Sequence, residues 1–259
     1  MLESKVLKKL NEGKPVLSTK VNFKDPGIME MIGIIGIDCI WLCREHLWIN
    51  DETLAAMILA ARSTGTDTMV RIERENYPSA VKIFEMGAKG IMIPHVLNAE
   101  EAKKIVRALK FYPVGRRGVD GGNADSGWMS MEFKRYLEFS NKETFLALQI
   151  EDLEAIDNLE EIASVPGYEM LFVGPGDLST SMGFPGEIDH KEVWNVLEKL
   201  GKLANKYGKF AGTISISTEW TKRLLDLGYL FINAGVDIIT LREYYMKLNE
   251  KYKKLGFLE

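Results

Sequence analysis

Short apolar runs alternate with longer segments of helical periodicity from one end of the chain to the other. The pattern predicts strands at residues 16–21, 39–43, 68–72, 90–94, 145–151, 170–174, 209–214 and 229–234. It predicts helices near residues 26–35, 51–64, 78–87, 98–110, 152–164, 190–207, 218–227 and 240–254. Near-continuous apolar strands that alternate with amphipathic helices are typical of a parallel sheet covered by helices. Eight such units favour a closed (β/α)₈ barrel over an open, doubly wound sheet.

The length of the chain agrees with a single barrel. Its 259 residues are close to the roughly 250 residues that one (β/α)₈ barrel needs. No G-x-G-x-x-G follows the first predicted strand and no P-loop occurs, which disfavours the dinucleotide-binding alternative. No linker, repeat or low-complexity tract divides the sequence. We therefore predict one catalytic barrel domain over residues 1–259.

Composition narrows the range of partners. Hydrophobic residues make up 46% and charged residues 27%, with a formal net charge of −4, so neither nucleic acid nor an anionic membrane is expected as a partner. No stretch approaches the roughly 20 apolar residues of a membrane-spanning helix, and the N-terminus lacks signal-peptide character. Cys39 and Cys43 would lie too far apart in one strand for an easy disulfide. Reduced thiols, and hence a cytoplasmic protein, are expected.

Two acidic residues stand at the carboxyl ends of neighbouring predicted strands. Glu151 closes LALQIE and Asp177 follows LFVGPGD. In barrels of this kind the strand ends and the loops after them form the catalytic face. Two carboxylates there could bind Mg²⁺ or Mn²⁺, which keep positions open for water and a chelating substrate. Helix capping explains either residue singly, but the pair in matching positions favours a metal site.

Further polar side chains follow other predicted strands. Arg71 closes TMVRI and could stabilise an enolate oxygen, or form a structural ion pair with one of the acids. His46 follows the second strand in CREH and is a natural general base, although a lone histidine there is more often a local hydrogen-bonding residue. His95 is expected at the rim and His190 in a structural role. Lys20 is the only lysine placed for a Schiff-base mechanism, which would leave the paired acids without a role.

Glycine-rich segments supply candidate contacts to a substrate. The long segment at 111–131 contains Arg116, Arg117 and several glycines, and we expect it to be an active-site loop. Its arginines could bind a second carboxylate of a substrate, or form a solvated basic turn. In Gly174-Pro175-Gly176, the backbone could approach a ligand carboxylate closely, although a tight turn also explains these residues.

Ordered motifs over nearly the whole chain resemble the HpcH/HpaI aldolase family of class II, metal-dependent aldolases. They include GIDCIWLCREH, EMGAKGIMIPHVLNAEEA, GRRGV, LQIE, VGPGDLSTSMG and AGVD, of which LQIE and VGPGDLS are the specific pair. The resemblance implies a (β/α)₈ barrel of the phosphoenolpyruvate/pyruvate-binding type with a final helix swapped between subunits. It implies that Glu151 and Asp177 hold the divalent cation, with Mg²⁺ or Mn²⁺ expected and Co²⁺ or Zn²⁺ as alternatives. It also implies that Arg71 supports the enolate of pyruvate.

The same resemblance assigns roles to three more residues. His46 would be the base, helped by Glu85 from a neighbouring subunit, and the backbone around Gly176 would receive the pyruvate carboxylate. From its position at the end of a predicted helix, Glu85 would otherwise lie away from the catalytic face. A homohexamer (a dimer of trimers) or a trimer is therefore expected.

The chain departs from the family pattern in the half of the site that would meet the aldehyde. Cys43-Arg44 replaces the usual Asp-Gly, Glu85 replaces an Asp, and the segment at 120–127 is shorter and lacks an arginine. An arginine at position 44, with Arg116 or Arg117, could attract the carboxylate of an acidic aldehyde such as a semialdehyde or glyoxylate. The alternative is that Arg44 turns outward to pair with Glu45 or a neighbouring subunit.

These observations predict an aldehyde-lyase that reversibly cleaves a 2-keto-4-hydroxy acid to pyruvate, or a close 2-oxo acid, and an aldehyde. One rival is a related carbon–carbon lyase or synthase that uses a thioester or oxaloacetate. A second rival is a non-catalytic relative that binds a small acid, which the Cys43-Arg44 departure would allow.

Overall fold

Eight parallel strands close into a barrel whose order around the circle follows the sequence, from β1 to β8 and back to β1. The computed structural model describes residues 2–257. The strands are β1 (Val16–Lys20), β2 (Cys39–Cys43), β3 (Asp67–Arg71), β4 (Gly90–Ile93), β5 (Phe145–Ile150), β6 (Met170–Val173), β7 (Phe210–Ser215) and β8 (Tyr229–Val236). Each lies within two residues of its predicted bounds. The structure confirms the predicted (β/α)₈ barrel.

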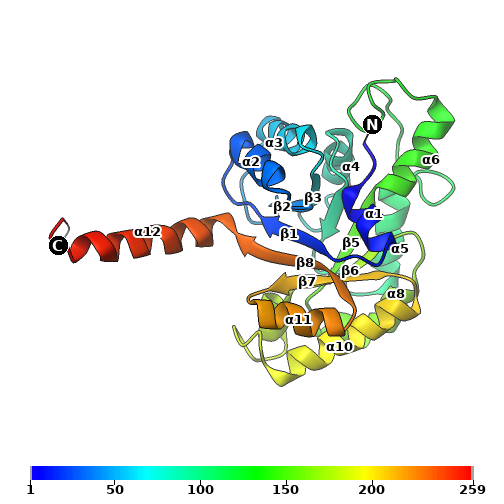
Figure 1. Cartoon of the computed structure of the whole chain (residues 1–259). Helices are drawn as coiled ribbons and strands as arrows, with labels where there is room; N and C mark the ends of the chain where they lie inside the picture. Colours follow the sequence, from blue (N-terminus) through cyan, green and yellow to red (C-terminus); the bar gives the residue numbers. More distant parts are fainter. Residues whose placement is uncertain (1, 258–259) are drawn as a thin grey trace.

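Helices cover the outside of the barrel between successive strands (Figure 1). They are α2 (Pro26–Ile35), α3 (Asp51–Ser63), α4 (Tyr77–Glu85), α5 (Ala99–Leu109), α6 (Phe133–Glu143), α7 (Leu153–Asp157), α8 (Leu159–Ser164), α9 (Pro175–Ser181), α10 (Lys191–Lys206) and α11 (Thr218–Asp226). Side-chain caps fix several of their starts, as Asn50 Oδ1 does by accepting from the Thr53 N–H at 2.8 Å. Among residues 2–257, no helix combines the length and apolar character that crossing a lipid bilayer requires.

Three helical features differ from the sequence expectation. The helix α6 was not predicted, because few of its side chains are apolar and only Tyr136, Ser140 and Glu143 are buried. The helix expected at 152–164 is broken at Asn158, whose side-chain amide donates to the Leu97 carbonyl oxygen at 3.0 Å. The short turn expected after β6 is the helix α9.

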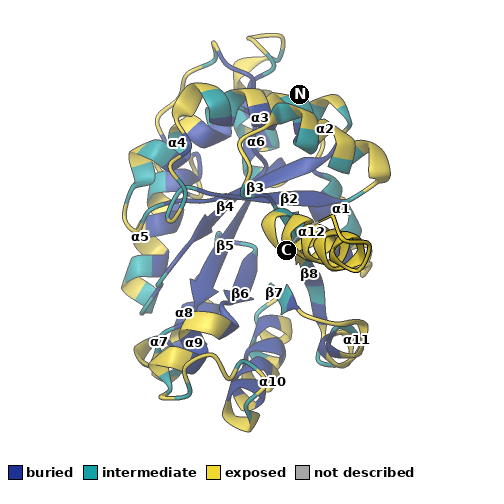
Figure 2. Cartoon of the chain, turned by 90° about the vertical axis from the view of Figure 1, so that its left-hand side faces the viewer, coloured by how far each residue is buried: buried dark blue, intermediate teal, exposed yellow. Residues whose placement is uncertain are grey.

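Apolar side chains pack in two layers, one inside the barrel and one between the strands and the helices. Trp41, Phe172 and Phe231 fill the interior with edge-to-face contacts, at 5.7 Å between the Trp41 and Phe172 ring centroids and 6.2 Å between those of Phe172 and Phe231. Figure 2 shows the buried strands surrounded by helices whose outer faces are exposed. Because apolar side chains fill the barrel interior, polar side chains can meet a ligand mainly at the two ends of the barrel.

The helix α1 (Lys5–Asn11) closes the amino end of the barrel. Its side chains Val6, Leu7 and Leu10 are buried in the interior cluster. A buried carboxylate anchors it, because Asp67 Oδ2 accepts from Ser4 Oγ at 2.7 Å and from the Val6 N–H at 2.9 Å. The site of chemistry is therefore left to the opposite, carboxyl end.

The last helix, α12 (Asp237–Lys253), projects away from the carboxyl end of the barrel (Figures 1 and 2). None of its residues is buried, and exposed apolar side chains run along it: Ile238, Ile239, Leu241, Tyr244, Tyr245, Met246, Leu248 and Tyr252. Its first residue is fixed to the barrel, because the Asp237 carboxylate accepts from the backbone N–H groups of Asn22 and Phe23 at 2.9 Å. Exchange of this helix between subunits stays a prediction.

Candidate active site at the carboxyl end of the barrel

The carboxylate of Glu151 lies at the centre of a polar cluster at the carboxyl end of the strands. Glu151 follows β5, and its side chain is fully buried. Its Oε2 atom accepts a short hydrogen bond from the side-chain amide of Gln149, two residues earlier on the same face of the strand. Its Oε1 atom accepts from the backbone N–H of His95 at 3.1 Å. Gln149 on β5 and His95, which follows β4, therefore hold the Glu151 carboxylate in one orientation.

Burial raises the pKa of Glu151 to about 7. The charge of His95 and its backbone N–H act in the opposite direction, as does the charge of Arg71, whereas the negative charge of Asp177 adds to the rise. Asp177 lies in the first turn of α9, after the neighbouring strand β6, and is exposed. The two predicted metal ligands thus interact electrostatically at the same end of the barrel.

Arg71 extends from the end of β3 into this cluster and is 4% exposed. Its guanidinium donates to Gln149 Oε1 at 3.4 Å and to Cys43 Sγ at 3.3 Å. Its Nε atom lies 2.9 Å from Glu45 Oε2, although the N–H group is not aligned on that oxygen. A buried guanidinium fixed on several sides can stabilise charge that develops on a substrate oxygen.

Glu45 connects Arg71 to both histidines of the site. Besides the Arg71 contact, its carboxylate lies 3.5 Å from His46 Nε2 and 3.7 Å from His95 Nε2. The side chain of His46 is 58% exposed, so its ring is open to solvent and to a ligand above the strand ends. From the sequence, Glu45 was expected only as an alternative partner of Arg44, although its place between Arg44 and His46 in CREH directs it to the same end of the barrel.

His95 has a larger part in the site than the rim position predicted for it. Its backbone adopts a φ of 52°, uncommon for a non-glycine residue, and its N–H group donates to Glu151 in this conformation. Its Nδ1 atom is 2.9 Å from Asp152 Oδ2 and 3.6 Å from Glu151 Oε1. Burial lowers the pKa of His95, but Asp152 and Glu151 outweigh it, so the net shift is upward.

Arg44 turns away from the strand ends. Its guanidinium forms a close ion pair with Asp51, in the first turn of α3, and its Nε atom lies 3.9 Å from Glu73. The outward alternative therefore describes this side chain, with Asp51 and Glu73 as partners in place of Glu45. Arg44 is not available to bind an acidic aldehyde in this conformation.

The loop at 111–131 lies at the amino end of the barrel, because it joins α5 to α6 ahead of β5. The guanidinium of Arg116 lies over the Tyr112 ring, at 5.2 Å from the centroid, and donates to the Gly115 carbonyl oxygen at 3.1 Å. Arg117 is buried and ion-paired with Asp125 at 3.0 Å. This placement corrects the expectation of an active-site loop within one chain. Neither arginine faces Glu151.

Glu85 ends α4 at the same amino end, as the sequence predicts. Its backbone oxygen accepts from the Ala124 N–H at 3.1 Å. Burial raises the pKa of its carboxyl group, against the positive charge of Arg117. Glu85 does not approach Glu151 of its own chain.

A divalent cation at this site would have only two acidic side chains of this chain, Glu151 and Asp177, as candidate ligands. Among residues 2–257, no three histidine, cysteine or acidic side chains converge as a ready-made metal cage. Mg²⁺ and Mn²⁺ do not require one, because they bind one or two carboxylates and complete their shells with water and substrate. The donor set of buried Glu151 and exposed Asp177 is of this kind. A Cβ atom at Gly176, next to Asp177, would have no neighbour within 4 Å among the described residues, so the backbone there is open to a ligand.

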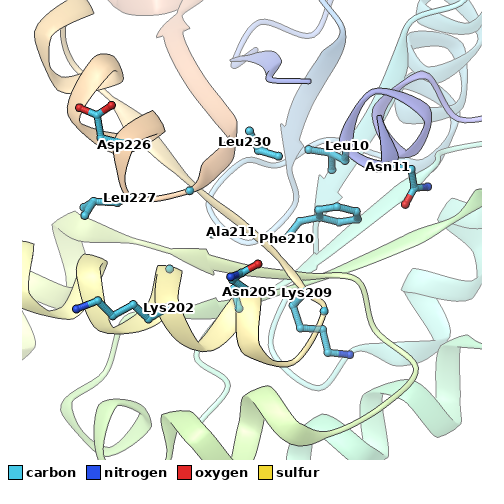
Figure 3. Close-up of a pocket in the computed structure, with 14 residues that line it drawn as sticks. Leu10, Asn11, Lys202, Asn205, Lys209, Phe210, Ala211, Asp226, Leu227 and Leu230 are labelled. Atoms are coloured by element: carbon cyan, nitrogen blue, oxygen red, sulfur yellow. The ribbon is translucent and has the colours of Figure 1, made fainter. Parts of the chain in front are cut away.

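A cavity of about 710 Å³ lies at the amino end, between α1, α10 and the turn after α11 (Figure 3). Its charged lining residues include Lys202, Lys209 and Asp226. It opens beside the first residues of β7 and β8, away from Glu151 and Asp177. It contains no pair of acids and is not part of the candidate active site.

The sequence of this chain is similar to those of known aldolases over most of its length. The family model described as HpcH/HpaI aldolase/citrate lyase matches residues 23–243. A 4-hydroxy-2-oxo-heptane-1,7-dioate aldolase of Shigella flexneri is 31% identical over 233 residues, which are 90% of this chain and 86% of the relative. A hydroxypyruvate/pyruvate aldolase of Pseudomonas aeruginosa is 30% identical over 95% of this chain and 91% of the relative.

Among solved structures, the crystal structure of the citrate synthase SbnG superposes with a TM-score of 0.89 at 27% identity, over 99% of both chains. The fold, the full-length matches and the names of the relatives support an aldolase function. The chain belongs to the HpcH/HpaI aldolase/citrate lyase family.

Proposed function

We propose that this protein is a divalent-cation-dependent aldehyde-lyase that cleaves or forms a 2-keto-4-hydroxy acid, with pyruvate or a close 2-oxo acid and an aldehyde as the other reactants. The observation that carries the proposal is the buried Glu151 carboxylate, which Gln149 and His95 orient and which feels the charge of Asp177, in the first turn of α9 after the neighbouring strand β6. Arg71, which donates to Gln149, adds a positive charge beside Glu151 that could stabilise negative charge on a substrate oxygen. We assign the whole barrel to one catalytic domain.

Glu151 and Asp177 would hold the cation, with Mg²⁺ or Mn²⁺ expected. When bound, the cation supplies a Lewis acid for the 2-oxo and carboxylate oxygens of the substrate. Burial makes a negative charge on Glu151 unfavourable and raises its pKa, and the charge of Asp177 adds a smaller contribution, so a bound cation would stabilise the ionised carboxylate. The backbone around Gly176, in the first turn of α9, would receive the carboxylate of the 2-oxo acid.

In the cleavage direction, the C3–C4 bond of the substrate breaks and its electron pair remains on the three-carbon fragment. Arg71 donates to the oxygen on which the negative charge accumulates. His46 accepts the proton of the C4 hydroxyl, directly or through a water molecule, and C4 becomes the aldehyde carbon. Glu45 orients His46 and Arg71 together, since its Oε2 atom lies within 3.5 Å of one and 2.9 Å of the other.

The proposal includes an assembly of at least three subunits, a trimer or a homohexamer. Glu85 lies at the amino end of its own barrel, so it can assist His46 only from another subunit. The unburied apolar face of α12 supports association, because monomers rarely expose so many adjacent apolar side chains. We also propose a cytoplasmic location, which fits the two buried, unpaired cysteines Cys39 and Cys43.

A second candidate function is a condensation that joins a 2-oxo acid to a thioester. It is favoured by the end-to-end similarity to the citrate synthase SbnG, over 99% of both chains. Turnover of oxaloacetate with an acyl thioester, and none of hydroxy-keto acids, would support this candidate in place of the aldolase.

The test combines cation binding with turnover. Calorimetric titration with Mn²⁺ should show one site in the wild type and strongly weakened binding in Glu151→Gln and Asp177→Asn. Turnover of 4-hydroxy-2-oxo acids should be lost in both variants and in excess chelator. Glu154→Gln, an exposed glutamate on α7, is the matched control and should behave as wild type. Full activity in chelator would exclude the cation-dependent mechanism.

A further inference from the structure

His95 links the segment after β4 to the end of β5 through its backbone. Its φ of 52° lies in the left-handed region, which few non-glycine residues adopt and in which histidine, asparagine and aspartate are enriched. In this conformation the His95 N–H donates to Glu151 Oε1 at 3.1 Å. The following N–H group, of Val96, donates to the Gln149 carbonyl oxygen at 3.2 Å. The position of Glu151 therefore depends on the backbone conformation at residue 95.

The side chain of His95 contacts Asp152, the residue after Glu151. His95 Nδ1 lies 2.9 Å from Asp152 Oδ2. An ionised carboxylate can only accept hydrogen bonds, so the proton in this contact lies on Nδ1 and the imidazole is the donor. His95 therefore binds two consecutive residues of the chain, Glu151 through its backbone and Asp152 through its ring.

Asp152 makes this contact in place of the one that its position favours. It is the N-cap residue of α7, where an aspartate side chain commonly accepts from the second or third N–H group of the helix. Among residues 2–257, the Asp152 side chain accepts no such bond. Its carboxylate is directed to His95 and not to its own helix.

We infer that the Asp152–His95 pair positions the proposed cation ligand Glu151 and thereby sets the affinity of the site for a divalent cation. The inference rests on the proposed function, because it takes Glu151 as a ligand of the cation. The contact between imidazole and carboxylate keeps residue 95 in the left-handed conformation, in which its N–H group meets Glu151 Oε1. His95 acts through Glu151 and is a positioning residue. Hydrogen-bonded groups that orient metal ligands commonly contribute roughly 10- to 100-fold to metal affinity.

Proton transfer is the alternative role for His95. Its Nε2 atom lies 3.7 Å from Glu45 Oε1, in the polar cluster that includes His46. Proton transfer requires the imidazole itself, whereas positioning requires only a donor at the place of Nδ1 and a residue that tolerates positive φ. Asparagine separates the two roles. Its side-chain amide places a donor where histidine has Nδ1, it tolerates positive φ, and it has no counterpart of Nε2.

Calorimetric titration with Mn²⁺, without substrate, tests the pair. His95→Ala should bind Mn²⁺ roughly 10- to 100-fold more weakly than wild type, because alanine offers Asp152 no donor and disfavours positive φ. His95→Asn should retain most of the affinity. The double variant His95→Ala/Asp152→Ala should lose little more than the weaker-binding single variant, because both changes remove the same contact. Asp157→Ala is the matched control, since it removes the same charge from an exposed position on α7.

Turnover at saturating Mn²⁺ separates positioning from proton transfer. His95→Ala should then recover most of its turnover, because Glu151 is oriented by the bound cation. A deficit that persists in both His95→Ala and His95→Asn would mean that the imidazole transfers a proton, and would overturn the inference. Unchanged Mn²⁺ affinity in His95→Ala, with binding intact in wild type, would overturn the inference alone. Absence of Mn²⁺ binding in wild type would reject the proposed function as well.

Discussion

Gly174 lies so close to the Glu151 carboxylate that a Cβ atom at position 174 would overlap Glu151 Oε2 and the side-chain amide of Gln149. The φ of Gly174 is −94°, so any residue could adopt its backbone conformation. The glycine is therefore required by the approach of the carboxylate from β5 and not by the turn that precedes α9. This contact couples the end of β6 to the orientation of the proposed metal ligand.

Gly174→Ala should accordingly displace Glu151 while leaving the barrel folded. A displacement of about 1 Å in a catalytic group can lower turnover roughly 10²-fold. We expect a loss of that order, with Mn²⁺ affinity reduced and far-UV circular dichroism unchanged. Gly118→Ala is the control, since a Cβ atom there meets no other atom and its φ is not positive. Normal turnover in Gly174→Ala would show that Glu151 need not occupy its present position.

The proton-transfer role of His46 can be isolated without an aldehyde. His46→Ala should slow the exchange of pyruvate methyl protons with deuterium by roughly 10²- to 10⁴-fold, the range for removal of a positioned acid–base group. Proton NMR measures this rate directly. His190→Asn is the control, because His190 caps α10 through its side chain and asparagine can also cap. Unchanged exchange in His46→Ala would move the role to His95 or Glu85.

The strands were predictable because they are short, apolar and separated by clear helical periodicity. The helix α6 was not, since two of its three buried residues, Ser140 and Glu143, are polar. The break at Asn158 depends on a hydrogen bond to the Leu97 carbonyl oxygen, from a distant part of the chain. Such tertiary contacts leave no mark in local hydrophobicity.

Within the site, the strand-end rule placed Glu151, Asp177, Arg71 and His46 at one end of the barrel. It could not distinguish Arg44, which points outward, from its neighbour Glu45, which points to Arg71. It also missed the Gln149 contact, although Gln149 and Glu151 are two residues apart and share a strand face. The directions of side chains after the last strand residue depend on loop geometry, which the hydrophobic pattern does not encode.

The surface of α12 predicts that association depends on its apolar residues. Tyr244 and Tyr245 are each 60% exposed, with ring centroids 5.6 Å apart. We expect the wild type to be at least trimeric by light scattering, and Tyr245→Glu to dissociate it, because burial of the new charge in an interface is unfavourable. Turnover should fall in parallel, since Glu85 can act only across subunits. Lys247→Glu is the control for charge on the same helix. A fully active wild-type monomer would contradict both the assembly and the role of Glu85.

The buried carboxyl group of Asp67, which anchors α1, predicts that the free energy of unfolding falls as the pH rises from about 4 to about 6. Burial raises the pKa of Asp67 to about 6, although hydrogen bonds from the Val6 N–H and Ser4 Oγ lower it in part. Its ordinary value is 3.8, so between these two values the folded protein retains a proton that the unfolded chain releases. The contribution of Asp67 to the free energy of unfolding is therefore greatest below about pH 4. It should decline as the pH rises to about 6, by up to about 3 kcal/mol.

Asp67→Asn isolates this contribution, because an amide oxygen can accept the same two hydrogen bonds but does not titrate between pH 4 and 7. Urea unfolding of both proteins should show the difference in unfolding free energy, wild type minus variant, falling with pH and levelling above about pH 6. Asp157→Asn, at an exposed position on α7, should show no comparable trend. A wild-type-minus-Asp67→Asn difference that stays constant from pH 4 to 7 would mean that Asp67 keeps an ordinary pKa and is not desolvated beneath α1.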